Sequence, residues 1–195
     1  LSPKPGWAEQ HPETWWQHVC QATRQLLSQS GVSPAAIKGI GIAYQMHGLV
    51  VVGKNQEVLR PSIIWCDSRA VGIGNRAFDE IGQEKCLTHL LNSPGNFTAS
   101  KLRWVQEHEP AIFERIHKMM LPGDYIAMRL TGEIATTPSG LSEGMLWDYQ
   151  TGQVASLVLR HFHFSSKLIP QVVPTFSHQG TLSSEAAEAT GLMAG

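Results

Sequence analysis

The chain has 195 residues, and its 15 Lys and Arg nearly balance 16 Asp and Glu, which leaves a formal net charge of -1. This balance argues against a general binder of nucleic-acid phosphates, which would carry a basic excess, and the length is enough to bury a sizeable core. Hydrophobic residues make up 42% and charged residues 16%, which argues against disorder, and no apolar run approaches the roughly 18 residues of a membrane span.

An amphipathic helix is predicted from Pro12 to Ser30. Proline is tolerated in the first turn of a helix, and apolar residues follow it at three- and four-residue steps. Gly31 provides the stop signal. A short helical turn is predicted next, at Ser33-Pro34.

Three strand-like runs follow this helix. Residues 38–44 (KGIGIAY) and 49–53 (LVVVG) are separated by the polar sequence Gln45-Met46-His47-Gly48. The third run, residues 62–65 (SIIW), ends at Cys66-Asp67-Ser68-Arg69. Together the runs predict a small antiparallel meander.

The remaining chain is predicted to be mainly helical, so that the whole forms one α/β unit. Residues 133–150 are rich in Thr, Ser and Gly between apolar anchors, which predicts strand and bulge rather than helix. The helices are expected at residues 69–82 and 83–91, from Thr98 as N-cap, from Pro110, over 125–130 with Asp124 as cap, over 154–161, and after Ser183 as cap.

The Gln45–Gly48 sequence is the first candidate site. A hairpin loop that needs only the right geometry would favour Asn-Gly or Asp-Gly. Here Gln45 and His47 instead offer several hydrogen-bonding atoms at a strand end, and Gly48 permits close approach. The pattern predicts recognition of a polyhydroxylated ligand, with a purely structural turn as the alternative.

A carboxylate and a guanidinium, Asp67 and Arg69, follow another predicted strand. Ligands of open α/β sheets bind at the carboxyl ends of strands, so this segment is a second candidate. The alternative is that Asp67 caps the following helix. Lys101 and Trp104 share one face of a predicted helix, but their spacing alone indicates no function.

Other chemistries find little support. Residues 72–77 fit G-x-G-x-x-A, but they follow a polar loop rather than a strand, so a dinucleotide site is not expected. His161 and His163 have no partners at the spacing of a metal site. The cysteines are odd in number and widely spaced, which predicts reduced thiols in a cytoplasmic protein. They are Cys20, Cys66 and Cys86, of which the first and last are expected in the core.

Several segments together carry a family resemblance. In order, the chain reads GWAEQHPETWW, IGIAYQMHG, LRPSIIWCDSR, FTASKLRWV, HEPAIF, LPGDYIAMRLTGEIATTPSG and GTLSSEAAEATGL. This series resembles the N-terminal half of the FGGY carbohydrate kinases, most of all their xylulokinase-like members, from about Gly6 to Gly191. The Q-M-H-G, I-x-W-x-D-x-R and F-T-A-x-K-L-x-W segments are specific as a set. The resemblance implies the actin/hexokinase-like (ribonuclease H-like) N-terminal lobe of a two-lobe sugar kinase, with the sugar in the cleft between the lobes.

The resemblance also implies a set of sugar-binding residues. Met46 and His47 are expected to contact the sugar, with Gln45 in the same loop, while Asn96 and Asp67 are expected to border the pocket. Asn96 departs from the Gly, Ser or aromatic residue usual in the family, which leaves the preferred sugar open. The implied substrate is D-xylulose or a similar ketose. Another pentulose, gluconate or a polyol is the alternative, as is a non-catalytic sugar-binding module.

The resemblance further implies ATP and Mg²⁺ as cofactors, bound mainly by a C-terminal lobe. The family's phosphate-binding D-x-G-T hairpin and its catalytic Asp find no counterpart in residues 1–195, so we expect a partial N-terminal domain, incomplete at both ends and inactive alone. Such a lobe would expose a sheet edge, which predicts a marginally stable or oligomeric chain, for example a homodimer. A cytoplasmic location is expected from the use of ATP, with neither membrane nor nucleic acid as partner.

Overall fold

The computed structural model describes all residues from Leu1 to Gly195, and it combines helices with short strands. The helices are α1 (Pro12–Ser30), α2 (Val71–Ile81), α3 (Gln83–His89), α4 (Thr98–His108), α5 (Pro110–Phe113), α6 (Pro122–Thr131), α7 (Pro138–Glu143), α8 (Ser156–Phe162) and α9 (Ser184–Thr190), with 3₁₀ turns at Pro34–Ala36 and Ser166–Leu168. The strands are β1 (Glu9–Gln10), β2 (Val50–Val52), β3 (Ser62–Ile63), β4 (Lys118–Met120), β5 (Ala135–Thr136), β6 (Trp147–Asp148), β7 (Gln153–Val154) and β8 (Gln171–Val172). No helix is both long and apolar enough to cross a membrane.

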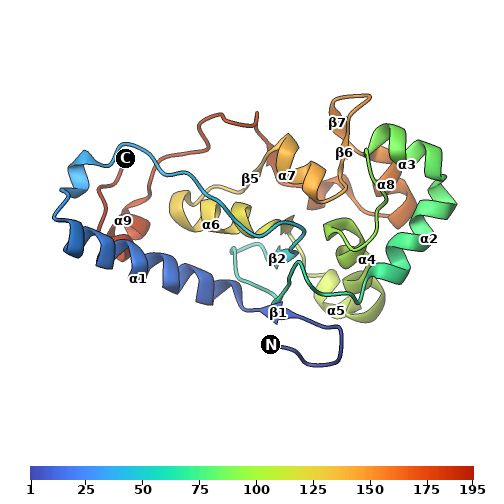
Figure 1. The fold of residues 1–195 in the computed structure, drawn as a ribbon, viewed down its shortest axis with the longest axis horizontal. Coiled ribbons are helices and arrows are strands. Elements are labelled where there is room, and N and C mark those ends of the chain that lie inside the picture. Colours follow the sequence, from blue (N-terminus) through green and yellow to red (C-terminus); the bar gives the residue numbers. More distant parts are fainter.

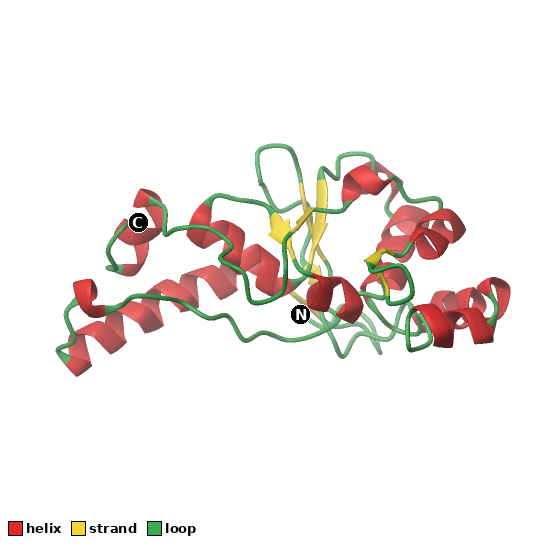
Figure 2. Ribbon diagram, turned by 90° about the horizontal axis from the view of Figure 1, so that it is seen from above, coloured by secondary structure: helices red, strands yellow, loops and turns green.

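The strands β2 and β4 pair antiparallel in the middle of the molecule, with Val51 opposite Met119 (Figure 2). Successive side chains of a strand point to opposite faces. Val51 and Met119 accordingly join one hydrophobic core, whereas Val50 and Val52 join another. The strand pair therefore separates two cores, and both of its faces are buried.

Helices cover the two cores at opposite ends of the molecule (Figure 1). The smaller core includes Trp16 of α1, Tyr125 of α6 and Ala186 of α9, and these three helices contact one another. The larger core includes Leu102 of α4 and Phe162 of α8, and α2 contacts both of these helices. The apolar face of each helix thus finds its partner within the chain.

Most of the predicted helices are confirmed, with small shifts at their ends. α1 has the predicted bounds and ends at Gly31, whose φ of 66° lies in the left-handed region that glycine adopts easily. The role predicted for Thr98 is wrong, because Phe97 occupies the N-cap position and the Thr98 hydroxyl donates a hydrogen bond to the Gly48 carbonyl instead. The cap position predicted for Asp124 is also wrong, because α6 begins at Pro122 with Leu121 as N-cap; Asp124 lies in its first turn and accepts a hydrogen bond from the Leu121 amide.

Two of the strand predictions are corrected by the structure. Residues 133–150 contain the short strands β5 and β6, but α7 lies between them, capped by the Thr137 side chain and opened by Pro138. Residues 38–44 are not a strand, and their backbone forms no hydrogen bond with any other segment. An apolar alternation favours an extended chain, but a strand also needs a neighbour to pair with, and none lies beside this segment.

The predicted meander also differs in its partners. Ile63 at the end of β3 forms an isolated bridge with Leu49, just before β2, so these two runs approach as expected. β3 pairs, however, with β1 near the N-terminus, outside the three predicted runs. These pairings bring the start of the second predicted run, at Leu49, close to Ile63 of the third run. The third run also lies next to the N-terminal segment at Glu9–Gln10.

Candidate functional site

The backbone of His47 is fixed by contacts from α4. Its φ of 60° lies in the left-handed region, which few residues other than glycine adopt and where histidine is among the more frequent. Its carbonyl accepts a hydrogen bond from Lys101 Nζ at 2.8 Å, and the carbonyl of Gly48 accepts one from Thr98 Oγ1 at 3.2 Å. A side chain at position 48 would have its Cβ 2.5 Å from Pro122 Cγ, so only glycine fits there. Contacts from two sides therefore hold this unusual turn in place.

The ring of His47 is held by α7 and by the residue before α4. Its Nδ1 lies 3.0 Å from the carbonyl oxygen of Glu143 and 3.4 Å from the carboxylate Oε2 of the same residue. Phe97 packs against the ring at right angles, with the ring centroids 4.3 Å apart. Because a carbonyl oxygen can only accept, Nδ1 carries the proton in this arrangement. Nε2 of the neutral ring then has a free lone pair that can accept a hydrogen bond from a hydroxyl group.

Gln45 and Met46 lie beside His47 and offer a mixed polar and apolar surface. Gln45 Oε1 accepts from the backbone amide of Trp65 at 3.4 Å, and its Nε2 donates to Gln10 at 3.2 Å. The residues Met46 and Trp65 are 51% and 57% exposed. A sugar carries hydroxyl groups on an apolar carbon skeleton, and this combination of exposed apolar groups and amide suits both parts.

Asp67 is buried beneath this surface and already has partners. Its carboxylate accepts from the Ala8 amide at 2.6 Å and from Arg69 Nη2 at 2.7 Å. The Arg69 guanidinium in turn lies 3.7 Å from the centre of the Trp7 ring and pairs with Glu9 at 2.8 Å. The carboxylate also accepts from the Arg69 amide at 2.9 Å, the contact of a structural turn. Direct contact of Asp67 with a sugar stays a prediction, and it would require this carboxylate to exchange partners.

Asn96 connects the two loops of the site. Its Nδ2 donates to the backbone carbonyl of Asp67, and its neighbour Phe97 packs on His47. Its Oδ1 is buried and has no hydrogen-bond partner. Of the five predicted residues, the structure thus places Gln45, Met46 and His47 side by side on one loop. Asn96 contacts the loop of Asp67, next to Phe97, which packs on the His47 ring.

Two further residues of the site were not predicted to have a role there. The sequence predicts Lys101 on an amphipathic helix, but its side chain is fully buried. This burial lowers its pKa to about 8, although the charge of Asp67 opposes the shift. A lysine within an apolar stretch is a weak signal of such a position. Glu143 is 96 residues from His47 in sequence, and no local pattern points to it.

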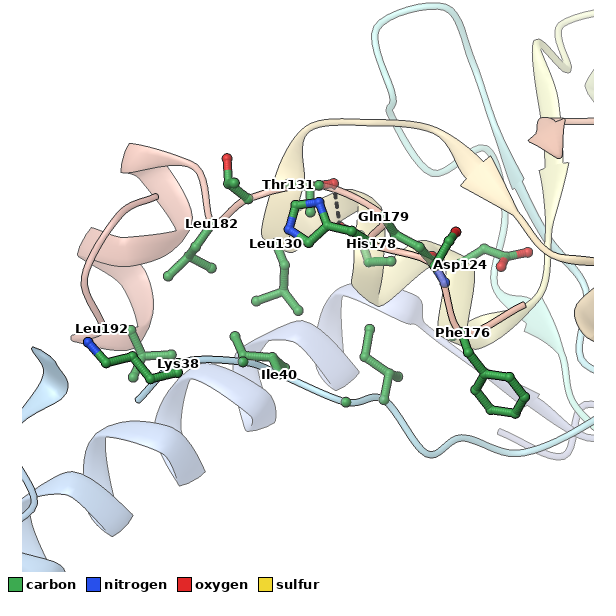
Figure 3. A pocket seen from close by; sticks show the side chains of 18 of the residues that line it. Lys38, Ile40, Asp124, Leu130, Thr131, Phe176, His178, Gln179, Leu182 and Leu192 are labelled. Carbon is green, nitrogen blue, oxygen red and sulfur yellow. Dashed lines mark hydrogen bonds between the residues drawn. The ribbon is translucent and has the colours of Figure 1, made fainter. Parts of the chain in front are cut away.

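Two cavities lie elsewhere, on either side of residues 37–43. One has a volume of about 450 Å³ and lies between this segment, α6 and the loop 175–182 (Figure 3). The other has about 490 Å³ and is bounded by α1. Neither is lined by any of the five predicted residues. Both follow from the unpaired 37–43 segment, whose side chains lack a neighbouring strand to pack on.

The chain has been compared with proteins of known sequence. Residues 1–195 match the model of the FGGY family of carbohydrate kinases, N-terminal domain. The chain is 37% identical over 190 residues to a xylulose kinase of Escherichia coli (strain K12), which covers 97% of this chain and 39% of that protein. It is 33% identical over 198 residues to a xylulose kinase of Bacillus subtilis (strain 168), covering 99% and 39%. The chain therefore spans about two fifths of the length of these curated relatives.

Solved structures share the fold. A xylulose kinase from Rhodospirillum rubrum superposes with a TM-score of 0.88 at 31% sequence identity, covering 100% of this chain and 41% of that one. A gluconate kinase from Lactobacillus acidophilus reaches a TM-score of 0.85 at 21% identity, over 99% of this chain and 39% of that one. The second likeness shows the fold alone. Together they confirm the predicted α/β fold, that of the N-terminal lobe of an actin/hexokinase-like sugar kinase.

Proposed function

Because the chain belongs to the FGGY family of carbohydrate kinases, whose N-terminal domain it matches, we propose that it supplies the sugar-binding part of a kinase that converts D-xylulose and ATP to D-xylulose 5-phosphate and ADP. The observation that carries this proposal is the placement of His47. Its backbone and ring are held by three other residues, Lys101, Glu143 and Phe97, and its Nε2 has a free lone pair. A histidine held in this way suits the recognition of one hydroxyl group.

Phosphoryl transfer to a sugar depends mainly on positioning and on neutralising charge. In our proposal this chain supplies the positioning. His47 Nε2 accepts a hydrogen bond from a sugar hydroxyl, Met46 packs against the carbon skeleton, and Gln45 and Asn96 border the pocket, supported by Asp67. ATP with Mg²⁺ supplies the phosphoryl group and places the reaction in the cytoplasm. No three His, Cys, Asp or Glu side chains of the chain gather as a metal site.

A different sugar is the main alternative. The chain is also 35% identical over 199 residues to an L-xylulose/3-keto-L-gulonate kinase of Escherichia coli (strain K12), which it covers by 40%. Asn96, with its partner-free Oδ1, is the residue through which another pentulose, gluconate or a polyol could be preferred. A sugar-binding module without catalysis is the remaining alternative, and it would bind the sugar without consuming ATP.

Replacement of His47 tests the proposal. His47→Ala, made in the protein as its source organism produces it, should raise the KM for D-xylulose about tenfold, because one hydrogen bond to the sugar is lost. His163→Ala is the matched control, since His163 also has a positive φ, 57°, but lies at the end of α8. This control should leave KM and kcat unchanged. Unchanged KM and kcat in His47→Ala would refute the role of His47.

A further inference from the structure

The segment from Asn96 to Lys101 contacts both loops of the candidate site. Thr98 Oγ1 and Lys101 Nζ donate to the consecutive carbonyls of Gly48 and His47. Asn96 Nδ2 donates to the carbonyl of Asp67, on the other loop. These three side chains of the segment therefore donate hydrogen bonds to backbone carbonyls of both loops.

Lys101 is the residue that contacts both loops with one atom. Its Nζ lies 2.8 Å from the His47 carbonyl oxygen and 3.0 Å from that of Ile64. Between the two loops, the last backbone hydrogen bond is that of the Leu49 amide with the Ile63 carbonyl, at 2.9 Å. Beyond it, no backbone hydrogen bond joins the two loops, although the Ile64 carbonyl accepts one from the Asp67 amide of its own loop at 3.1 Å. The ammonium group of Lys101 provides the link between the loops at this point.

The position of Lys101 has an energetic cost that its packing does not explain. A buried cation loses its hydration, and an apolar side chain of similar length would fill the same space without that loss. Hydrogen bonds from a charged donor are stronger than neutral ones and hold their acceptors more firmly. An apolar side chain could not replace the hydrogen bonds by which the Lys101 ammonium group joins the His47 and Ile64 carbonyls.

We propose that Lys101 is a positioning residue of the sugar site, which binds the His47 and Ile64 carbonyls and so fixes the spacing between the turn of Gln45–His47 and the loop that begins at Ile64. Its effect on the sugar rests on the proposed function. The link itself is a property of the fold and can be tested without sugar. In this proposal Lys101 does not touch the sugar itself and acts on it through the position of His47.

The test compares two lysines that form the same kind of contact. Lys118 Nζ also donates to two backbone carbonyls, those of Lys167 and Ile169, each at 2.8 Å, but between β4 and the 3₁₀ turn at Ser166–Leu168. Lys101→Met should raise the KM for D-xylulose about tenfold, with a smaller change in kcat. The His47 carbonyl then loses its donor, the Ile64 carbonyl keeps only the Asp67 amide, and the turn shifts. Lys118→Met should leave KM as in the wild type. Equal KM values in the two variants would overturn the proposal.

A second measurement works without sugar. Phe97 packs edge-on against His47, so the NMR signals of the His47 ring respond to any shift of the turn. These signals should move in Lys101→Met and stay in place in Lys118→Met, and identical spectra would overturn the proposal. Should Lys101→Met not fold, Lys101→Gln is measured in the same way, since its shorter amide can still donate. If the wild type neither binds nor phosphorylates the sugar, the proposed function fails, while the His47 signals still decide the role of Lys101.

Discussion

Three buried ionisable side chains of this chain differ in what compensates their charge. Asp67 is paired with Arg69, and Lys101 donates to two carbonyls. Asp124 accepts one hydrogen bond, from the Leu121 amide, and forms no ion pair. Burial consequently raises its pKa from 3.8 to about 7, against the effect of that hydrogen bond. Burial thus shifts the pKa of Lys101 down and that of Asp124 up, in each case toward the neutral form.

The pKa of Asp124 predicts how stability depends on pH. Between pH 4 and 7 the folded chain holds a proton on Asp124 that the unfolded chain has released, so this residue's contribution to the unfolding free energy falls as pH rises through this window. Asp124→Asn removes this titration. The unfolding free energy of the variant minus that of the wild type should therefore increase from pH 4 to 7, by at most about 1.4 kcal/mol per pH unit, and then level off. Urea unfolding at several pH values measures it, and a difference independent of pH would contradict the assignment.

The packing of α2 explains a motif that resembles a nucleotide loop. Gly72 and Gly74 fit part of G-x-G-x-x-A in sequence, but both lie inside α2. A Cβ at Gly74 would lie 1.8 Å from the carbonyl oxygen of Gly95, the residue before Asn96. A Cβ at Gly72 would have no closer neighbour than Arg76, at 3.8 Å. The second glycine is thus required for the close approach of a helix to the loop that carries Asn96.

Substitution of the two glycines should have opposite effects. Gly74→Ala should lower the unfolding free energy by about 2 kcal/mol or more, because the methyl group meets rigid backbone. Gly72→Ala should raise it by about 0.5–1 kcal/mol, since alanine loses less backbone entropy in a helix. Chemical unfolding of the two variants and the wild type measures these changes in the unfolding free energy. A Gly74→Ala variant as stable as the wild type would show that α2 and the loop are not in close contact.

Helices were more predictable here than strands. The proline and glycine at the two ends of α1, and Ser183 before α9, are local signals that act within one turn. Residues 38–44 have the pattern of a strand, but their pairing depends on a segment elsewhere, which no local pattern reveals. The helix α7 was missed because Thr, Ser and Gly favour loops, whereas the Thr137 cap and Pro138 start a helix.

The candidate site was predicted to the extent that it is local in sequence. Gln45, Met46 and His47 form one turn and were found together. Glu143 reaches His47 from α7, and Lys101 reaches it from α4, through contacts that only the folded chain brings about. The family resemblance supplied Asn96, whose side chain binds the backbone carbonyl of Asp67 and whose neighbour Phe97 packs on His47. Residues 38–44 are unpaired but form no strand, so the expected open sheet edge and self-association through it stay predictions.

The preference among sugars tests the proposed function most directly. The protein as its source organism produces it should be incubated with ATP, Mg²⁺ and, in turn, D-xylulose, L-xylulose, D-ribulose, gluconate and glycerol, and kcat/KM measured for each. We predict the highest kcat/KM for D-xylulose and formation of D-xylulose 5-phosphate. A higher kcat/KM for gluconate or glycerol, or no phosphorylation of any sugar, would contradict the proposal.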